Sequence, residues 1–214
     1  MRLRNIPGSE EALLNSTYVI DEPEALKGRW QEEFGNENPI YAEIGMGKGR
    51  FIIESAKRHP ERNYIGIEMY SSVLVRAVQK LEKEEREIEN LRLLRIDARD
   101  LASCFDQDEI AGIYLNFSDP WPKDRHAKRR LPGKEFLKLY DRILQPEGRI
   151  EFKTDNKSLF EFALEQLPLA GWKSEYVTFD LHADAEMMKD NVLTEYEEKF
   201  AAKGNPICKY IIFR

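Results

Sequence analysis

Three alternating glycines, Gly45, Gly47 and Gly49, lie between a short apolar run and a helical pattern. Glycines at such a place permit a tight turn and a close approach of a ligand to the backbone. Glu68 ends the next apolar run, and an acidic residue there can accept hydrogen bonds from both hydroxyls of a ribose. Together these residues predict a site for a cofactor that contains a nucleoside.

A second group of residues with chemical potential lies in the segment 117–131. It carries Lys123, Arg125, Lys128, Arg129 and Arg130 against a single opposing charge, Asp124. In a chain with a net charge of −6, such a basic segment predicts contact with the phosphates of a polyanion. Trp121 beside it offers a flat face on which a base can stack, or a side chain for the core of the protein.

The elements that position these residues follow from hydrophobic periodicity. Strands are expected at 39–44, 63–68, 91–96, 110–117, 148–153, 174–181 and 207–213. Helices are expected at 48–58, 71–87, from Gly133 to 144, at 158–167 and at 194–202, and the acidic run 82–89 is interpreted as a solvated helix face. This alternation predicts an α/β fold with a mostly parallel, seven-stranded sheet, helices on both faces and an antiparallel C-terminal strand pair. The expected organisation is an N-terminal extension, 1–38, and a single domain, 39–214.

Carboxylates follow four of the expected strands. In parallel sheets ligands bind at the carboxyl ends of the strands, and these ends carry Glu68, Asp97, Asp119 and Asp155. A purely structural sheet does not need them. Other interpretations remain open, since Asp97 can cap a helix or a turn, Asp119 with Pro120 can form a plain turn, and Asp155 can cap the helix after it.

Composition restricts the class of protein. The chain has 214 residues, of which 42% are hydrophobic and 34% are charged, as in a globular protein. Its apolar runs are too short to cross a membrane, and no apolar stretch follows the basic start 1–4, so we expect no signal peptide and a cytoplasmic location. Cys104 and Cys208 are far apart, and His59, His126 and His182 have no ligand spacing, so no disulfide framework or metal site is expected.

The glycine loop also distinguishes between cofactors. Arg50 stands where a dinucleotide fingerprint has its third glycine, and there is no phosphate-binding loop of the ATPase type. With Glu43 two residues before Gly45, the loop resembles motif I of class I AdoMet-dependent methyltransferases, and an acidic neighbour suits a sulfonium better than a pyrophosphate. The resemblance implies a Rossmann-like fold and AdoMet as cofactor. It implies as cofactor-binding residues Glu43, Gly45, Gly47, Glu68 at the ribose, and Asp97 and Ala98 by the adenine.

The basic segment resembles one particular family of methyltransferases. Its residues 118–131, SDPWPKDRHAKRRL, are similar to PDPWPKKRHxKRRL, the signature of bacterial tRNA (guanine-N7-)-methyltransferases. The motifs EIGMGKGRF at 43–51, KTDN at 153–156 and TEYEEKF at 194–200, with Gly204 after it, match the same family in the same order. Ser118, Asp124 and Ala127 depart from the family pattern, and none of these changes removes a proposed functional group.

The family resemblance implies methyl transfer from AdoMet to N7 of a guanosine in tRNA, in the family the guanosine of the variable loop. It implies Asp119 as the catalytic residue, in contact with both AdoMet and the base. It implies substrate contacts for Lys123, Asp155, Thr194, Tyr196 and Glu197, and RNA contacts for Arg125, His126, Lys128, Arg129 and Arg130. By spacing alone, Thr194 and Glu197 form a capping box, and both roles are compatible. No membrane or obligatory protein partner is expected, and the chain is a monomer or a homodimer.

Three other functions remain possible. The segment 118–121 also resembles, distantly, the Asp/Asn-Pro-Pro-aromatic motif of enzymes that methylate exocyclic amines. A nucleotide-dependent oxidoreductase is disfavoured by Arg50 and Glu43. A non-catalytic RNA-binding protein with the same fold would bind tRNA and form no methylated product.

Overall fold

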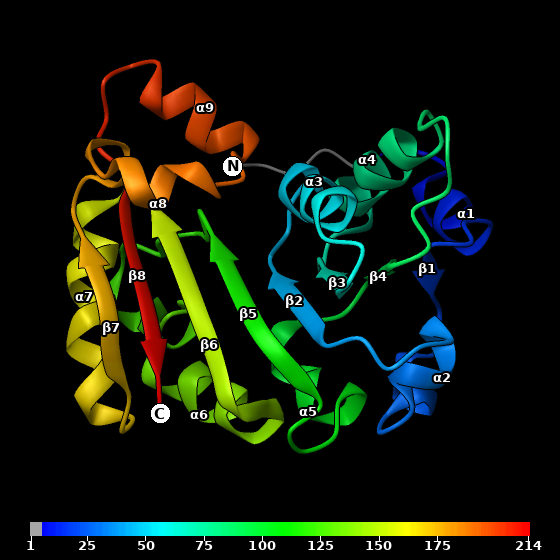
Figure 1. Ribbon diagram of the computed structural model, residues 1–214, viewed down its shortest axis with the longest axis horizontal. Coiled ribbons are helices and arrows are strands. Elements are labelled where there is room, and N and C mark those ends of the chain that lie inside the picture. Colours follow the sequence, from blue (N-terminus) through cyan, green and yellow to red (C-terminus); the bar gives the residue numbers. More distant parts are fainter. Residues whose placement is uncertain (1–5) are drawn as a thin grey trace. The chain divides into compact units, whose positions relative to one another are not determined.

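The computed structural model describes residues 6–214, so the basic start of the expected N-terminal extension lies outside the described residues. Contacts divide the chain into two compact units, Met1–Asp106 and Gln107–Arg214. Figure 1 labels their helices and strands. Each unit is an α/β structure with four strands.

The first unit contains a parallel sheet in the order β1-β4-β3-β2. Its strands are β1 (Val19–Ile20), β2 (Ile40–Ile44), β3 (Asn63–Ile67) and β4 (Leu91–Leu94). Its helices are α1 (Ser9–Leu14), η1 (Pro23–Leu26), α2 (Trp30–Phe34), α3 (Arg50–Arg58), α4 (Ser71–Leu81), η2 (Ala98–Asp100) and α5 (Leu101–Cys104). All five residues of β3 are buried, as expected for a central parallel strand.

The second unit has the strand order β5-β6-β8-β7, and β8 is antiparallel to both of its neighbours. Its strands are β5 (Ile110–Asn116), β6 (Leu144–Thr154), β7 (Lys173–Thr178) and β8 (Cys208–Phe213). Its helices are η3 (Asp124–Arg129), α6 (Lys134–Ile143), α7 (Lys157–Leu169), η4 (Leu181–Ala183), α8 (Ala185–Lys189) and α9 (Glu195–Ala201). In Figure 1, α8 and α9 lie at the end of this unit toward which the arrows of β5 and β6 point.

The expected fold class is confirmed: the strands are mostly parallel, and the antiparallel ones are C-terminal. Every expected strand is present within a few residues of its predicted bounds, but residues 6–214 contain eight strands rather than seven. The additional strand, β1, has two residues in the N-terminal segment, too few to show a period. Its residues form a strand because they pair with Leu93 and Leu94 of β4.

The N-terminal segment packs into the first unit. Trp30 is fully buried, stacks on Phe105 with ring centroids 5.4 Å apart, and donates its indole N–H to the carbonyl of Cys104. The hydroxyl of Tyr18 accepts a hydrogen bond from the backbone N–H of Ile88. These contacts make residues of the segment part of the core of the unit.

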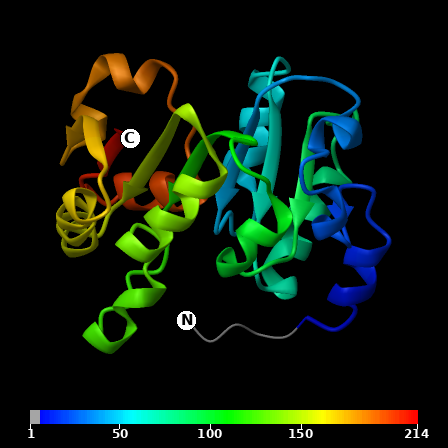
Figure 2. The ribbon, with the colours of Figure 1, turned by 90° about the horizontal axis from the view of Figure 1, so that it is seen from below.

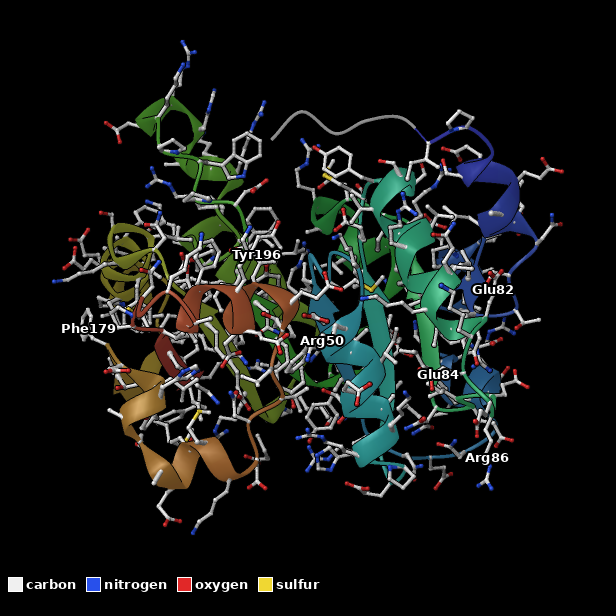
Figure 3. The ribbon with its side chains drawn as sticks, turned by 90° about the horizontal axis from the view of Figure 1, so that it is seen from above. Arg50, Glu82, Glu84, Arg86, Phe179 and Tyr196 are labelled. Carbon is white, nitrogen blue, oxygen red and sulfur yellow. The ribbon has the colours of Figure 1, made fainter. Side chains whose placement is uncertain are left out.

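The prediction of a helix through the acidic run was wrong. Helix α4 ends at Leu81, and Glu82, Glu84 and Arg86 lie in the irregular segment after it (Figure 3). Ile88 would continue the apolar face of the helix, but it is buried with its N–H bound to Tyr18. A tertiary hydrogen bond therefore takes the place of the helical one.

Candidate functional site

In the first unit, the glycine loop connects β2 to α3. Gly45, Gly47 and Gly49 all have positive φ, between 59° and 76°, a conformation that favours glycine. The backbone N–H groups of Gly45 and Met46 both donate to the carbonyl of Ile67, which fixes the loop beside the end of β3. The loop is therefore held by the neighbouring strand, in the conformation that its glycines permit.

Two of these glycines have different surroundings. A Cβ on Gly49 would lie 2.8 Å from the Cβ of Ala77 on α4, so this glycine allows two helices of the unit to approach closely. A Cβ on Gly47 would meet no described atom within 4 Å. Gly47 therefore borders open space among the described residues, as a loop that receives a ligand must.

Glu68 follows β3 and is joined to the loop. Its Oε2 accepts a hydrogen bond from the N–H of Gly47 at 3.2 Å, and its Oε1 accepts one from the N–H of Tyr70 at 3.1 Å. A carboxylate oxygen can accept more than one hydrogen bond, so a residue of this type at this strand end is suited to ribose hydroxyls. Glu43 on β2 is 2% exposed, and its register partner on β3 is Gly66. The structure thus brings Glu43, Gly45, Gly47 and Glu68 to one end of the sheet.

Asp97 and Ala98 follow β4, the neighbour of β3. Asp97 caps the short helix η2, since its Oδ1 accepts from the N–H of Arg99, and it also binds the Arg99 side chain at 2.6 Å. The hydrogen bond with Arg99 lowers the pKa of Asp97 below its usual value. The capping interpretation is confirmed, and Asp97 remains charged and partly exposed at the strand end.

In the second unit, the segment after β5 carries Asp119. Asp119 is exposed. Two residues before it, Phe117 has a positive φ of 51°, and two residues after it, Trp121 has a positive φ of 42°. Such values in large aromatic residues cost about 1–3 kcal/mol each and persist only where the surroundings impose them. The N–H of Phe117 donates to the carbonyl of Lys153 on β6, which holds one end of the segment.

The basic segment continues as η3, which stands away from the rest of its unit in Figure 2, in green. Lys123, Arg125, Lys128 and Arg129 are exposed. The guanidinium of Arg129 lies over the ring of Trp121, 4.9 Å from its centre, and the ring of His126 is perpendicular to that of Trp121 with ring centroids 5.8 Å apart. Trp121 is therefore partly exposed and flanked by two basic side chains, and it does not enter the core.

Arg130, predicted to contact RNA, is directed differently. Its guanidinium donates to the carbonyls of Pro120 and Trp121 and lies 4.4 Å from the ring centre of Phe162. The sequence pattern of consecutive basic residues does not distinguish Arg130 from Arg129, because only the direction of the side chain differs.

Asp155 follows β6 and is partly exposed. The cap of α7 is Asn156, whose Oδ1 accepts from the N–H of Leu159 at 2.8 Å. The interpretation of Asp155 as the helix cap was therefore wrong, and its carboxylate is not used for that purpose.

Thr194 and Glu197 belong to α9. Thr194 is the N-cap, with its hydroxyl accepting from the N–H of Glu197 at 2.9 Å, so half of the capping box is confirmed. The Glu197 side chain does not reach back to complete it: its Oε2 binds Lys153 at 2.7 Å, and its Oε1 binds Asn191 at 2.6 Å and His182 at 3.1 Å. Because Glu197 is fully buried and both oxygens are engaged, it acts inside the unit.

Lys153 is the residue that the sequence interpretation missed. It is buried, and its ammonium donates to Glu197, to Asn191 and to the carbonyl of Val192, which accounts for all three of its N–H groups. Burial lowers the pKa of Lys153, and the charge and hydrogen bond of Glu197 oppose that effect. The available signal was a lysine beside Phe152 at the end of an expected strand, since a lysine that is buried there requires a carboxylate partner.

Tyr196 is on the exposed side of α9, where Figure 3 labels it. Its ring stacks on Phe117 and on Phe200, with centroid distances of 6.3 and 6.1 Å. The stack joins α9 to the segment of Asp119. The structure thus brings Asp119, Asp155 and Tyr196 to the strand ends of the second unit.

None of the helices in the described part of the chain is long and apolar enough to cross a membrane. Among residues 6–214 no group of three or more histidine, cysteine, aspartate or glutamate side chains is arranged for a metal ion.

Solved structures define the class of fold. The chain superposes on a structure described as an antibiotic-related methyltransferase with a TM-score of 0.64 at 18% identity, over 86% of this chain and 92% of that one. It superposes on the 16S rRNA methyltransferase KamB with a TM-score of 0.63 at 12% identity, over 86% and 91%. The fold is that of class I methyltransferases.

Sequence comparison is more specific. The family model described as "Putative methyltransferase" (Methyltransf_4) matches residues 37–210. A tRNA (guanine-N(7)-)-methyltransferase of Lachnoclostridium phytofermentans is 56% identical over 100% of this chain and 99% of its own, and one of Lysinibacillus sphaericus is 53% identical over 97% and 95%. The chain belongs to the tRNA (guanine-N7)-methyltransferase family.

Proposed function

We propose that this protein transfers the methyl group of AdoMet to N7 of a guanosine in tRNA, the guanosine of the variable loop by family resemblance. The observation that carries the proposal is the 56% identity, over the whole chain, with a tRNA (guanine-N(7)-)-methyltransferase. It is supported by an exposed Asp119 beside an exposed basic segment. The family model spans both compact units, so we propose that residues of both serve this one activity.

The residues of the first unit fit AdoMet. Open space at Gly47, the carboxylate of Glu68 beside it, and a second acidic residue, Glu43, suit a ligand with ribose hydroxyls and a positive charge. Gly45 permits the turn, and Asp97 with Ala98 at the neighbouring strand end lies by the adenine. When bound, AdoMet supplies an electrophilic methyl group on its sulfonium.

The acceptor atom determines what the second unit must do. Guanine N7 carries a lone pair and no proton, so no base has to remove a proton before attack. The protein has to hold the guanine in place, and correct placement supplies up to about 7–11 kcal/mol of the barrier in favourable reactions. Asp119 contacts the reacting atoms and stabilises the positive charge that develops on the purine.

Guanine is recognised through its N1–H and N2–H₂ donors, which require acceptors. Of the two carboxylates that the sequence offered, Asp155 is partly exposed and Glu197 is buried with both oxygens engaged. We therefore assign the guanine edge to Asp155, and to Thr194 and Glu197 a structural role in placing α9. Tyr196 offers the exposed aromatic face of α9 to the nucleotide.

The tRNA backbone is bound by exposed cations. The exposure of Arg125, Lys128 and Arg129, with His126 beside Trp121, supports contacts to phosphates, and the exposure of Lys123 supports its contact with the target nucleotide. We propose tRNA as the macromolecular partner and the cytoplasm as the location.

The test is incubation of purified protein with unmodified tRNA and AdoMet, followed by mass spectrometry of the nucleosides. We expect N7-methylguanosine, and we expect its loss in Asp119→Ala while AdoMet binding persists. The matched control is Asp124→Ala, a nearby exposed carboxylate with no assigned role. A methylated exocyclic amine would keep the cofactor and refute the acceptor atom, and tRNA binding without any methylated product would refute catalysis.

A further inference from the structure

The side chain of Arg130 is directed toward its own loop, although it ends the most basic stretch of the chain. Its Nε donates to the carbonyl of Pro120 at 3.1 Å, and its Nη2 donates to the carbonyl of Trp121 at 3.0 Å. These two carbonyls lie on either side of the Trp121 Cα. Trp121 is the residue with φ of 42°, so the guanidinium bridges the strained peptide units.

Arg130 is itself fixed on every side. Its backbone N–H donates to the carbonyl of Ala127, and its carbonyl accepts from the N–H of Gly133. A Cβ on Gly133 would lie 2.9 Å from that carbonyl oxygen, so only glycine fits there. The outer face of the guanidinium lies over the ring of Phe162 on α7 at 4.4 Å. These contacts hold the side chain where it reaches both carbonyls.

The position of the bridge matters because Asp119 precedes Pro120. We propose that Arg130 is a positioning residue, which holds the 119–121 backbone so that Asp119 is presented to the reacting base, and that it does not bind RNA phosphate. Phe162 lies on α7, the helix that begins after Asp155, so the same contact connects the segment of Asp119 to the helix that follows Asp155. The inference rests on the proposed function for the meaning of Asp119, but the bridge has a readout that does not depend on activity.

Lysine cannot replace arginine in this role. An ammonium is a compact charge without the planar fork that reaches two acceptors at once. Arg130→Lys therefore keeps the positive charge but loses the planar guanidinium that bridges the two carbonyls and lies over Phe162. Arg130→Ala removes the charge as well as the guanidinium. Lys138→Ala, an exposed residue on α6, is the control for the loss of one positive charge in the same unit.

The first readout is kinetic. We expect Arg130→Lys and Arg130→Ala to lower kcat about 10²-fold, the cost of misplacing a reacting group by about 1 Å, with KM for tRNA and the salt dependence of tRNA binding unchanged. An exposed phosphate contact behaves differently: Lys128→Ala should raise KM and reduce the salt slope by about 1. Lys138→Ala should change none of these quantities.

The second readout is the fluorescence of Trp121. The other two tryptophans, Trp30 and Trp172, are 0% and 4% exposed, so quenching by acrylamide reports mainly on Trp121. We expect both Arg130 variants to show increased quenching and Lys138→Ala to match the unchanged protein. This measurement distinguishes failure of the inference from failure of the proposed function, since it needs neither AdoMet nor tRNA.

Three results would overturn the inference. One is a reduced salt slope with normal kcat in Arg130→Lys or Arg130→Ala, which would make Arg130 a phosphate contact. Another is full activity of Arg130→Lys, which would show that charge alone suffices. The third is unchanged quenching of Trp121 in folded Arg130→Lys. Because this result needs only the lysine variant, the test remains decisive if Arg130→Ala does not fold.

Discussion

Lys153 Nζ and Glu197 Oε2 are 2.7 Å apart, with side chains that are 4% and 0% exposed. The pair joins the end of β6 to α9, and the other carboxylate oxygen, Oε1, is hydrogen-bonded to His182 and Asn191. The carbonyl of the same Lys153 accepts from Phe117, whose ring stacks on Tyr196. One buried ion pair thus connects the strand, the helix and the segment that bears Asp119.

Removing one charge of this pair should destabilise the protein strongly. Glu197→Gln leaves a buried ammonium without its counter-ion, and breaking a buried pair costs about 3–5 kcal/mol. Denaturant unfolding measures the loss. Glu186→Gln, which breaks the exposed pair with Lys189, should cost no more than about 1 kcal/mol. Equal effects of the two substitutions would contradict the account of the pair.

The same carboxylate should make stability depend on acid pH. Burial alone would raise the pKa of Glu197, but the charge of Lys153 and the bonds from Lys153, His182 and Asn191 outweigh burial and hold it below the usual 4.5. A carboxylate whose folded pKa is lowered contributes its full stability above its unfolded pKa and loses it as the pH falls through the folded value. As the pH is lowered below about 4.5, we expect the unfolding free energy of the unchanged protein to decrease more steeply than that of Glu197→Gln. Parallel pH profiles would exclude this contribution.

Two glycines of the first loop should respond differently to alanine. Gly49→Ala combines a positive φ with a Cβ 2.8 Å from Ala77, and should cost about 2 kcal/mol or more in folding free energy. Gly47→Ala meets no described atom and should cost about 1–2 kcal/mol from its φ alone. Its main effect should be a raised Kd for AdoMet, measured by calorimetry. Normal AdoMet binding by Gly47→Ala would place the cofactor elsewhere.

Asp155 and Asn156 are neighbours with separate tasks. Asn156→Ala removes the cap of α7 and should cost about 1 kcal/mol of stability, with little change in KM for tRNA. Asp155→Ala should leave the melting temperature nearly unchanged and reduce methylation at least tenfold, the effect of about 1.4 kcal/mol. Thermal unfolding and methyl-transfer assays on both variants measure the separation. Loss of stability without loss of rate in Asp155→Ala would refute its role in recognising guanine.

Local patterns in the sequence were sufficient for the elements and for the glycine loop. Strands β2 and β3, the loop from Gly45 to Gly49 and the cap at Thr194 depend on periodicity, turn conformation and short hydrogen bonds, all encoded within a few residues. The exposed basic segment was predicted for the same reason, since one stretch of chain contains all its charges.

Only the tertiary structure decided the roles of particular polar side chains. Arg129 and Arg130 are identical in type and adjacent, yet one lies over the exposed ring of Trp121 and the other bridges two carbonyls. Glu197 fits a substrate ligand by its motif, and it is buried because Lys153, far away in the chain, requires a counter-ion. The sequence determined which groups are available and on which elements they stand. The direction of each side chain depended on the folded chain, because a buried charge or a strained peptide is stabilised by partners outside its own turn or strand.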